Sequence, residues 1–407
     1  MSVAELQIDG RSIARARGRD GSARGVYLGS EVEAHPGIWV RGYVYGASGY
    51  AQEMLPLVLG LESSGRRVRV DPVGSSADYD GLMPHRIRTA LEVMKLRPMD
   101  LAKSVLFQLV PGADFRLDLY ARSQVGRTMF ETDSLPDGWA EQCNAMDEVW
   151  VPSQFNYETF AAAGVEEKRL RRTLEGEDTH LFRPGHAPLE IPETRGFNFL
   201  SIFEWIMRKG PDVLLRAFLT EFRGDEDVAL IIRAYGRPDR NAELLPQVLY
   251  FIERELKMRL EDCPPVILVH GFLDNLDMPR LYAGADCFVL PSRGEGWGRP
   301  YTEALACEVP VIATRWSGQM DFLTDANSYL VDCKVVPVPA NVDTEVYAGH
   351  RWAEPDVEHL RALMRRAFTK RDEAKQKAMR GRCDVVEKLD WSVITEAWGK
   401  EFERLLA

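Results

Sequence analysis

Hydrophobic and polar positions along this chain follow two alternating periods, one typical of β-strands and one typical of amphipathic helices. Residues 38–44 form a β-branched and aromatic run, residues 51–64 repeat apolar side chains at helical spacing, and residues 68–73 have the pattern of a second strand. This order of strand, glycine-containing turn, helix and strand has the length of a parallel β-α-β crossover. Regular structure is therefore predicted to begin near Gly37 with such a unit.

The same alternation continues through the rest of the chain in two series. Strands are predicted at residues 104–110, 127–132, 148–152, 197–203, 228–235, 265–270, 287–291 and 309–314, and helices at 154–163, 211–222, 247–260, 277–283 and 299–307. A proline-rich stretch at 184–194 separates the two series and is the predicted linker. The predicted fold class is α/β, with two doubly wound, Rossmann-like domains that face each other across a cleft.

The domain boundaries follow from this pattern. We expect a polar leader over residues 1–36, an N-terminal domain over 37–190, a C-terminal domain over 195–385 and an amphipathic final helix over 386–407. In sheets of this kind ligands bind beyond the carboxyl ends of the strands. Candidate site residues are therefore expected at strand ends.

Composition and charge narrow the class of protein. With 45% hydrophobic, 10% aromatic and 28% charged residues, the 407-residue chain has the make-up of a globular protein. Its 51 Lys and Arg against 62 Asp and Glu give a net charge of −11, which argues against a general nucleic-acid binder. No apolar run reaches the roughly 18 residues of a membrane span and no secretory signal is visible, so a cytoplasmic location is expected. The six Cys residues form no C-x-x-C pair and are expected to be free thiols, mostly buried.

The stretch with the most specific chemistry is residues 287–306, where an apolar strand meets a glycine-rich turn that opens a helix. Glycines let the backbone approach a ligand, and Pro300 has no N–H group to donate. Four backbone N–H groups are expected to be free at the helix start: those of Gly298, Arg299, Tyr301 and Thr302. A helix N-terminus of this kind favours a phosphate group.

Two carboxylates, Glu295 and Glu303, flank this turn eight residues apart. Glu303, one turn into the helix, has the position of a carboxylate that accepts hydrogen bonds from a ribose diol. As a bare pair they would be ordinary solvated charges, because Glu is common and the spacing alone is a weak signal. Their context is more specific: Glu-Gly-Trp-Gly-Arg-Pro-x-x-Glu-Ala resembles the E-x7-E signature of the GT-B retaining glycosyltransferases of the family 4 type.

The resemblance covers the C-terminal half nearly continuously. Arg208-Lys209-Gly210 resembles the K-G turn of that family, and Gly271-Phe272 after a strand resembles its base-binding loop. In the N-terminal half the match is one of pattern, mainly Gly46-x-x-Gly49, which is placed like the family's glycine loop near acceptor and diphosphate and which also fits a simple tight turn.

The resemblance implies a nucleotide-activated sugar as donor, held mainly by the C-terminal domain. It implies that Lys209 with Arg208 neutralises the diphosphate, where charge builds up on the departing group. Glu295 would then bind the sugar hydroxyls and Glu303 the ribose. Arg233, at a strand end, either faces the same cleft or is a surface charge. Enzymes of this type normally work without a metal, so no metal and no cofactor are expected.

Two departures from the family pattern weaken the match. The position that usually holds an Arg, five residues before the Lys of the K-G turn, is Glu204, and a carboxylate cannot bind a diphosphate. The histidine that many relatives carry after their fourth strand is absent. Glu131 or Asp133 is an alternative group for orienting donor or acceptor there, and both are equally well explained as loop or helix caps.

These observations predict a retaining glycosyltransferase that moves a sugar from a nucleotide-sugar to a glycan, a lipid-linked acceptor or another hydroxyl acceptor, in glycan or polysaccharide biosynthesis. Two alternatives stay open. One is a non-catalytic relative that binds nucleotide or serves as a scaffold subunit, and the other is an epimerase or hydrolase, for which no base is evident. Peripheral contact with the inner membrane, through Arg365 and Arg366 or the arginines of the leader, is also left open.

Overall fold

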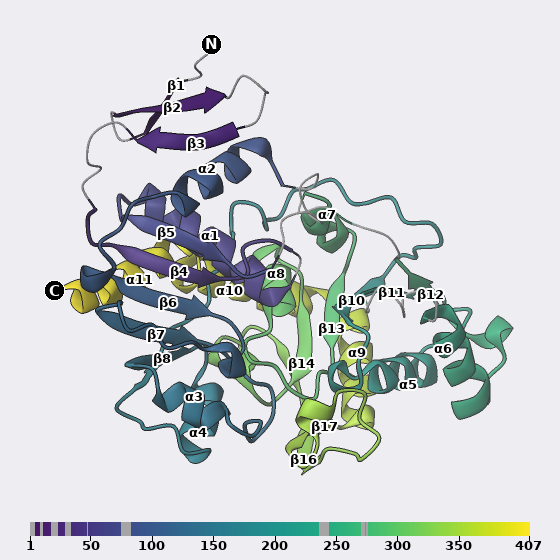
Figure 1. Ribbon diagram of the computed structural model, residues 1–407. Coiled ribbons are helices and arrows are strands. Elements are labelled where there is room, and N and C mark those ends of the chain that lie inside the picture. The colour runs from purple at the N-terminus through teal and green to yellow at the C-terminus, as the bar shows by residue number, and fades with distance from the viewer. Residues whose placement is uncertain are drawn as a thin grey trace. The chain divides into compact units, whose positions relative to one another are not determined.

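The structure is a computed structural model that describes residues 5–8, 11–17, 23–28, 34–46, 48–74, 83–235, 244–269, 273 and 276–407 of the chain. It contains two parallel sheets of six strands each, with helices between the strands (Figure 1). Each sheet has the alternating strand and helix order of a Rossmann-like α/β domain. The predicted α/β class with two Rossmann-like domains is confirmed.

One sheet is built from the first half of the chain in the order β5-β4-β6-β7-β8-β9. Its strands are β4 (Ile38–Gly42), β5 (Val68–Pro72), β6 (Val105–Leu109), β7 (Ser123–Arg127), β8 (Glu148–Val151) and β9 (Leu170–Arg172). Its helices are α1 (Gly49–Ser63), α2 (His85–Lys95), α3 (Trp139–Asn144) and α4 (Gln154–Ala162).

The other sheet follows the order β12-β11-β10-β13-β14-β15. Its strands are β10 (Asn198–Glu204), β11 (Ala229–Tyr235), β12 (Val266–Leu268), β13 (Cys287–Leu290), β14 (Val311–Thr314) and β15 (Tyr329–Val331). Its helices are α5 (Pro211–Glu221), α6 (Leu244–Tyr250), α7 (Asp277–Ala283), α8 (Arg299–Ala306), α9 (Val357–Thr369) and α10 (Arg371–Lys388). A hairpin of β16 (Cys333–Pro337) and β17 (Arg351–Pro355) and the final helix α11 (Trp391–Leu406) complete the second half.

The strand order places a switch point between β10 and β13. From β10 the chain proceeds outward to β11 and β12, whereas from β13 it proceeds to β14 and β15 on the other side. Strands β10 and β13 are buried along almost their whole length because helices cover both faces of the sheet, and α5 packs against α9 while α8 packs against α10 (Figure 1). In such sheets ligands bind beyond the carboxyl ends of the strands at the switch point.

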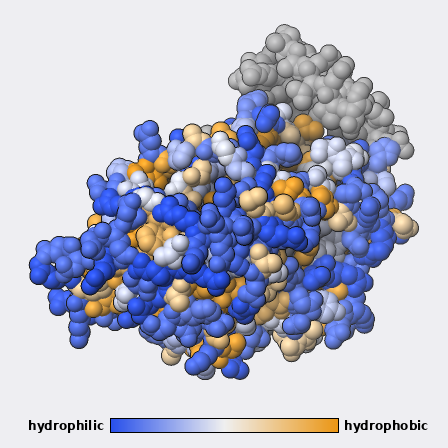
Figure 2. Space-filling view, turned by 180° about the vertical axis from the view of Figure 1, so that it is seen from behind, coloured by the Kyte–Doolittle hydropathy of each residue, from blue (hydrophilic) through white to orange (hydrophobic). Residues whose placement is uncertain are grey.

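By compactness the chain divides into a smaller unit of residues 1–110, 116–125 and 398–407 and a larger unit of residues 111–115 and 126–397. The domain boundaries predicted from the sequence stay predictions. Within the predicted leader, β1 (Glu5–Ile8), β2 (Arg11–Arg17) and β3 (Ala23–Leu28) form a separate antiparallel sheet. The prediction that regular structure begins near Gly37 is therefore wrong. The face of the molecule seen in Figure 2 is largely hydrophilic, with apolar side chains in small groups.

Two predicted elements differ from the structure. The strand expected at 127–132 lies at Ser123–Arg127. It begins with polar residues, which do not have the apolar pattern of a strand. The apolar residues after Arg127 lie outside the strand and pack against other elements. Phe130, for example, packs edge-on against Trp139 with ring centroids 5.1 Å apart. The helix expected at 247–260 ends earlier, with α6 followed by one wider turn at Phe251–Glu255, and Lys257 has a left-handed backbone with φ of 56° that stops it.

Candidate active site

The side chains that follow β10 and β13 meet in one buried cluster. Lys209 Nζ lies 2.6 Å and 2.7 Å from the two carboxylate oxygens of Glu295. Arg208 Nη1 lies 3.5 Å from Glu295 Oε2 and donates to the carbonyl oxygen of Gly294 at 2.5 Å. None of the three charged side chains is more than 13% exposed. The structure therefore brings together three residues that the sequence had singled out.

Charge in this cluster decides the protonation state of Glu295. Burial raises the pKa of a carboxyl group, but Lys209 and Arg208 outweigh this effect, and the pKa of Glu295 lies below its usual value. Burial also lowers the pKa of the Lys209 ammonium group, an effect that Glu295 opposes. Glu295 is therefore ionised at neutral pH, and its oxygens act only as hydrogen-bond acceptors.

Arg208 has a second carboxylate partner in Glu131, which lies just beyond β7. Glu131 Oε1 is 3.3 Å from Arg208 Nη2. Tyr347, from the segment between β16 and β17, accepts from Arg208 Nε at 3.0 Å and donates to Glu131 Oε2 at 3.2 Å. The guanidinium carbon also lies 5.6 Å from the centre of the Tyr347 ring. Arg208 is thus enclosed by protein acceptors, and it organises the cluster rather than presenting an open cation.

Of the two carboxylates weighed at this strand end, only Glu131 joins the cluster. Asp133 is exposed, and its Oδ1 accepts the backbone N–H group of Arg351 at 2.7 Å. Tyr347 was not predicted at all. No local pattern marks it, because it lies 139 residues from Arg208 and only the fold joins the two.

Glycines at the carboxyl end of β13 let separate backbone segments come close together. A Cβ atom on Gly294 would collide with the carbonyl oxygen of Glu131, and one on Gly318 would collide with the carbonyl oxygen of Gly296. Ser153 Oγ donates to that same Gly296 carbonyl at 3.0 Å. The glycines are therefore required by packing within the protein, whatever ligand binds beside them.

Helix α8 begins as the sequence predicted. Gly298, with φ of 103°, precedes the first helical residue, and Pro300 lies in the first turn. The N–H group of Tyr301, expected to be free, instead donates to the Gly298 carbonyl at 3.0 Å, so this part of the prediction is wrong. The buried Tyr301 hydroxyl donates to the Leu290 carbonyl at 2.8 Å and ties the helix to β13.

Arg299 and Glu303 belong to a second buried cluster, together with two carboxylates from the segment after β9. Arg299 Nη1 donates to Glu175 Oε1 at 2.8 Å, Nη2 lies 3.8 Å from Glu177 Oε1, and Nε lies 4.0 Å from Glu303 Oε1. Thr302 Oγ1 is 2.6 Å from Glu177 Oε2. Burial raises the pKa of both Glu177 and Glu303, although Arg299 opposes it. Arg299 is neutralised by protein carboxylates, a role that the sequence did not predict.

Three further predicted residues, Arg233, Gly46 and Gly49, belong to the described part of the chain. Arg233, in β11, donates to the backbone carbonyl of the next residue at 3.1 Å. Gly46, with φ of 113°, and Gly49, the first residue of α1, belong to the smaller compact unit. Gly271 and Phe272 lie outside the described residues.

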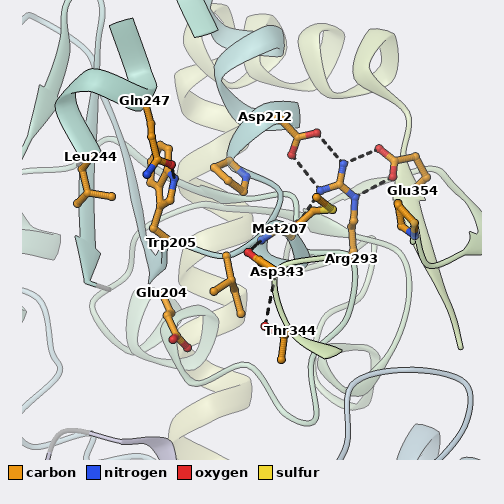
Figure 3. Close-up of a pocket in the computed structure, with 13 residues that line it drawn as sticks. Glu204, Trp205, Met207, Asp212, Leu244, Gln247, Arg293, Asp343, Thr344 and Glu354 are labelled. Carbon is orange, nitrogen blue, oxygen red and sulfur yellow. Dashed lines mark hydrogen bonds and ion pairs between the residues drawn. The ribbon is translucent and has the colours of Figure 1, made fainter. Parts of the chain in front are cut away.

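A cavity of 490 Å³ borders the turn that carries Arg208. Figure 3 shows the Arg293 guanidinium between two carboxylates that line the cavity. The guanidinium nitrogens lie 2.8 Å and 2.9 Å from the Asp212 oxygens and 2.7 Å from a Glu354 oxygen. Glu204 also lines this cavity. The carboxylate-rich wall disfavours an anion.

Neither a metal centre nor a membrane span emerges from the described parts of the chain. Among these residues, no three or more His, Cys, Asp and Glu side chains are grouped so that they could hold a metal ion. The helices of the same segments all lack the length or the apolar character needed to cross a bilayer.

Comparison with known proteins finds a family match within the C-terminal half. Residues 196–338 match the family model described as glycosyl transferases group 1. D-inositol 3-phosphate glycosyltransferase 1 of Catenulispora acidiphila is 30% identical over 172 residues, which are 39% of this chain and 38% of that protein. D-inositol 3-phosphate glycosyltransferase of Saccharomonospora viridis is 28% identical over 236 residues, 56% of this chain and 48% of that protein. The chain spans less than half the length of each of these relatives.

Similar solved structures share the fold over most of the chain. The crystal structure of Anabaena HepE in complex with UDP and glucose has a TM-score of 0.65 at 14% identity and covers 90% of this chain and 100% of that one. Sucrose-phosphate synthase from Thermosynechococcus elongatus has a TM-score of 0.65 at 15% identity and covers 92% of this chain and 99% of that one. At such low identity the likeness shows the fold, which is that of the GT-B glycosyltransferases with two Rossmann-like domains.

Proposed function

We propose that this chain transfers a sugar from a nucleotide-sugar to a hydroxyl acceptor, because residues 196–338 match the family model of the group 1 glycosyl transferases. The observation that carries the proposal is the buried Lys209–Glu295 pair, at 2.6 Å, beyond the carboxyl ends of β10 and β13. The pair lies at the switch point of the sheet, beside the glycine turn that opens α8. It offers an ionised carboxylate for sugar hydroxyls and an ammonium group for the diphosphate.

We propose that transfer retains the configuration at the anomeric carbon. The bond between that carbon and the phosphate oxygen breaks, the bond to the acceptor oxygen forms on the same face, and the acceptor proton passes to the departing phosphate oxygen. No strong protein base is required, which agrees with the absence of a histidine from the Glu131 position. Lys209 and the start of α8 stabilise the negative charge that builds up on the diphosphate, so activity is expected to persist in a metal chelator.

The names of the relatives support a choice of substrates. Two relatives are D-inositol 3-phosphate glycosyltransferases, another is a GDP-mannose-dependent phosphatidylinositol monomannoside mannosyltransferase, and the HepE structure holds UDP and glucose. We therefore propose a UDP- or GDP-sugar as donor and a polyol, glycan or lipid-linked hydroxyl as acceptor. We place the reaction in the cytoplasm, with the inner membrane surface as the source of a lipid-linked acceptor.

Release of nucleoside diphosphate from sugar nucleotides tests the proposal. The wild-type chain should hydrolyse its donor slowly without acceptor, whereas Lys209→Met and Glu295→Gln should each lower this rate by about a hundredfold or more. Lys168→Met is the matched control, because its ammonium group is 74% exposed and far from the cluster in sequence. Equal rates for Lys209→Met and Lys168→Met would contradict the assignment of Lys209.

One observation favours a second function, that of a non-catalytic nucleotide-binding or scaffold subunit. Glu204 occupies the position of the usual Arg and lines an acidic cavity, so one diphosphate contact of the family is missing. Under this alternative the chain binds UDP or GDP in calorimetry but releases no nucleoside diphosphate from any sugar nucleotide. Under the proposed function both binding and release are observed.

A further inference from the structure

A tyrosine hydroxyl that the proposed reaction does not use contacts the second carboxylate of the site. Tyr282, in α7, is fully buried, and its Oη donates to Glu303 Oε2 at 2.8 Å, with the Pro300 carbonyl oxygen 3.2 Å away. Burial, together with the neighbouring Glu303, raises the pKa of Tyr282 well above its usual value. The hydroxyl therefore keeps its proton at neutral pH, where it donates a hydrogen bond to Glu303.

The Tyr282 side chain, which carries this hydroxyl, is held rigidly. The Tyr282 ring packs edge-on against Phe182 with centroids 6.0 Å apart and tilted against Phe288 at 5.9 Å. Both neighbours belong to the buried core of this domain, so the ring cannot turn its hydroxyl elsewhere. A hydroxyl fixed in this way selects one orientation of the Glu303 side chain.

The other carboxylate oxygen of Glu303, Oε1, can still accept hydrogen bonds. In the part of the chain that the structure describes, Glu303 Oε1 accepts no hydrogen bond, and Arg299 Nε beside it is 4.0 Å away, too far for one. Arg299 instead forms an ion pair with Glu175, at 2.8 Å. The orientation of Glu303 thus depends on Tyr282, and its remaining acceptor capacity is at Oε1.

We propose that Tyr282 is a positioning residue that directs Glu303 Oε1 toward the ribose of the donor and so determines preference for ribonucleotides over 2′-deoxyribonucleotides. This rests on the proposed function, in which Glu303 accepts hydrogen bonds from the ribose hydroxyls. When Oε2 is hydrogen-bonded to Tyr282, the orientation of the carboxylate is fixed, and Oε1 is directed toward the ribose hydroxyls. Without the tie the carboxylate must be ordered by the ligand, which weakens the contact.

Tyr282→Phe tests the inference, because it removes only the hydroxyl. The probes are UDP and GDP with their 2′-deoxy forms, and the readout is the dissociation constant of each by calorimetry. Wild type should prefer the ribose form, and Tyr282→Phe should bind that form roughly tenfold more weakly while its affinity for the 2′-deoxy form is unchanged. Tyr329→Phe, at a buried tyrosine in β15 away from α8, is the matched control and should keep the wild-type preference.

A double-mutant cycle separates positioning from a general effect on packing. Glu303→Gln should lose the ribose preference as well, and Tyr282→Phe combined with Glu303→Gln should lose nothing further, because both changes act through one contact. Glu303→Gln also tests the contact from the acceptor side if Tyr282→Phe does not fold. An unchanged ribose preference in Tyr282→Phe, or additive losses in the double variant, overturns the inference alone. If the wild type binds neither UDP nor GDP, the proposed function fails together with it.

Discussion

Glu295 is a charged group inside the protein, and its partners come from a different strand. Removing a carboxylate from water costs several kcal/mol unless opposite charges and hydrogen bonds replace the solvent. Lys209 and Arg208, both in the turn after β10, supply those charges, and the turn after β13 supplies the carboxylate. The pKa of Glu295 therefore falls although the group is buried, which is what a hydrogen-bond acceptor for sugar hydroxyls requires.

At the same scale, Gly294 is expected to tolerate no side chain. In Gly294→Ala the new Cβ atom meets the carbonyl oxygen of Glu131, so the backbone has to move, at a cost of about 1–3 kcal/mol in the free energy of unfolding. Gly49→Ala is the control, because no atom lies within 4 Å of its Cβ position and alanine is the better helix former. Urea unfolding of the two variants measures the difference. Equal stabilities would show that the strand end accommodates the methyl group.

Glu177 is expected to make stability depend on pH. Burial, reinforced by Glu303 and opposed by Arg299, raises its pKa to about 7, against roughly 4.3 in the unfolded chain. Between these values the folded protein keeps a proton that the unfolded chain has released, so the free energy of unfolding falls as pH rises through this window and is level above it. Glu177→Gln, which cannot ionise, should lack this fall.

Melting temperatures between pH 4.5 and 8 check this expectation. The melting temperature of Glu177→Gln relative to wild type should rise with pH across the window. The exposed control Glu190→Gln should follow the wild-type profile. A parallel profile for Glu177→Gln would mean that Glu177 is already ionised at the acid end.

At the scale of elements, α4 connects helix capping with the site. Ser153 Oγ accepts the Asn156 N–H group at 3.2 Å as the cap of α4, and it also donates to the Gly296 carbonyl in the turn beyond β13 at 3.0 Å. A single hydroxyl thus caps the start of α4 and donates a hydrogen bond to the glycine turn beyond β13. Among the described residues, the side chain of Asp356, the N-cap residue of α9, makes only the capping hydrogen bond, which it accepts from the His359 N–H group at 3.0 Å.

Ser153→Ala is therefore expected to cost more than Asp356→Ala. Loss of a cap costs roughly 1 kcal/mol, and the unpaired buried carbonyl of Gly296 adds about 1 kcal/mol or more. Chemical denaturation of both variants measures this, and donor turnover should fall only in Ser153→Ala, because only that hydroxyl reaches the glycine turn. If the two variants lose the same stability, the contact with Gly296 contributes nothing.

At the scale of the whole molecule, the last residues of the chain complete the core of its first half. Trp398 and Phe402, in α11, pack against Phe107 of β6 with ring centroids 5.7 Å and 5.3 Å apart. Residues 398–407 accordingly belong to the smaller compact unit, whereas the start of α11 belongs to the larger one. Trp398 and Phe402 thus belong to the core of the smaller compact unit.

Phe402→Ala is expected to destabilise the smaller unit by about 3–5 kcal/mol, because the side chain is fully buried and leaves a cavity. Val393→Ala, on the same helix but 43% exposed, should cost less than about 0.5 kcal/mol. Calorimetry of both variants measures the effect, and a transition unchanged in Phe402→Ala would contradict a structural role for this end of the chain.

Strand and helix order could be predicted for most of both sheets, because their apolar positions repeat locally. The predictions failed where tertiary contacts decide the local structure. At 127–132 the apolar residues Met129 and Phe130 suggested a strand, but the ladder lies just before them and they fill space between other elements. The helix expected at 247–260 was predicted too long, since a left-handed residue at Lys257 has no signal in the apolar pattern.

The sequence by itself determined the alternation of strands and helices and the glycine turn after β13, and it singled out Lys209 and Glu295 as candidate site residues, because each depends on neighbours along the chain. Only the tertiary structure decided which partners the charged side chains have. Arg208 is enclosed by Glu131 and Tyr347, and Glu303 is bound by Tyr282, 21 residues away. Whether a charge inside a protein is stable, and which way a carboxylate points, depends on atoms brought close by folding, and the order of residues does not specify that proximity.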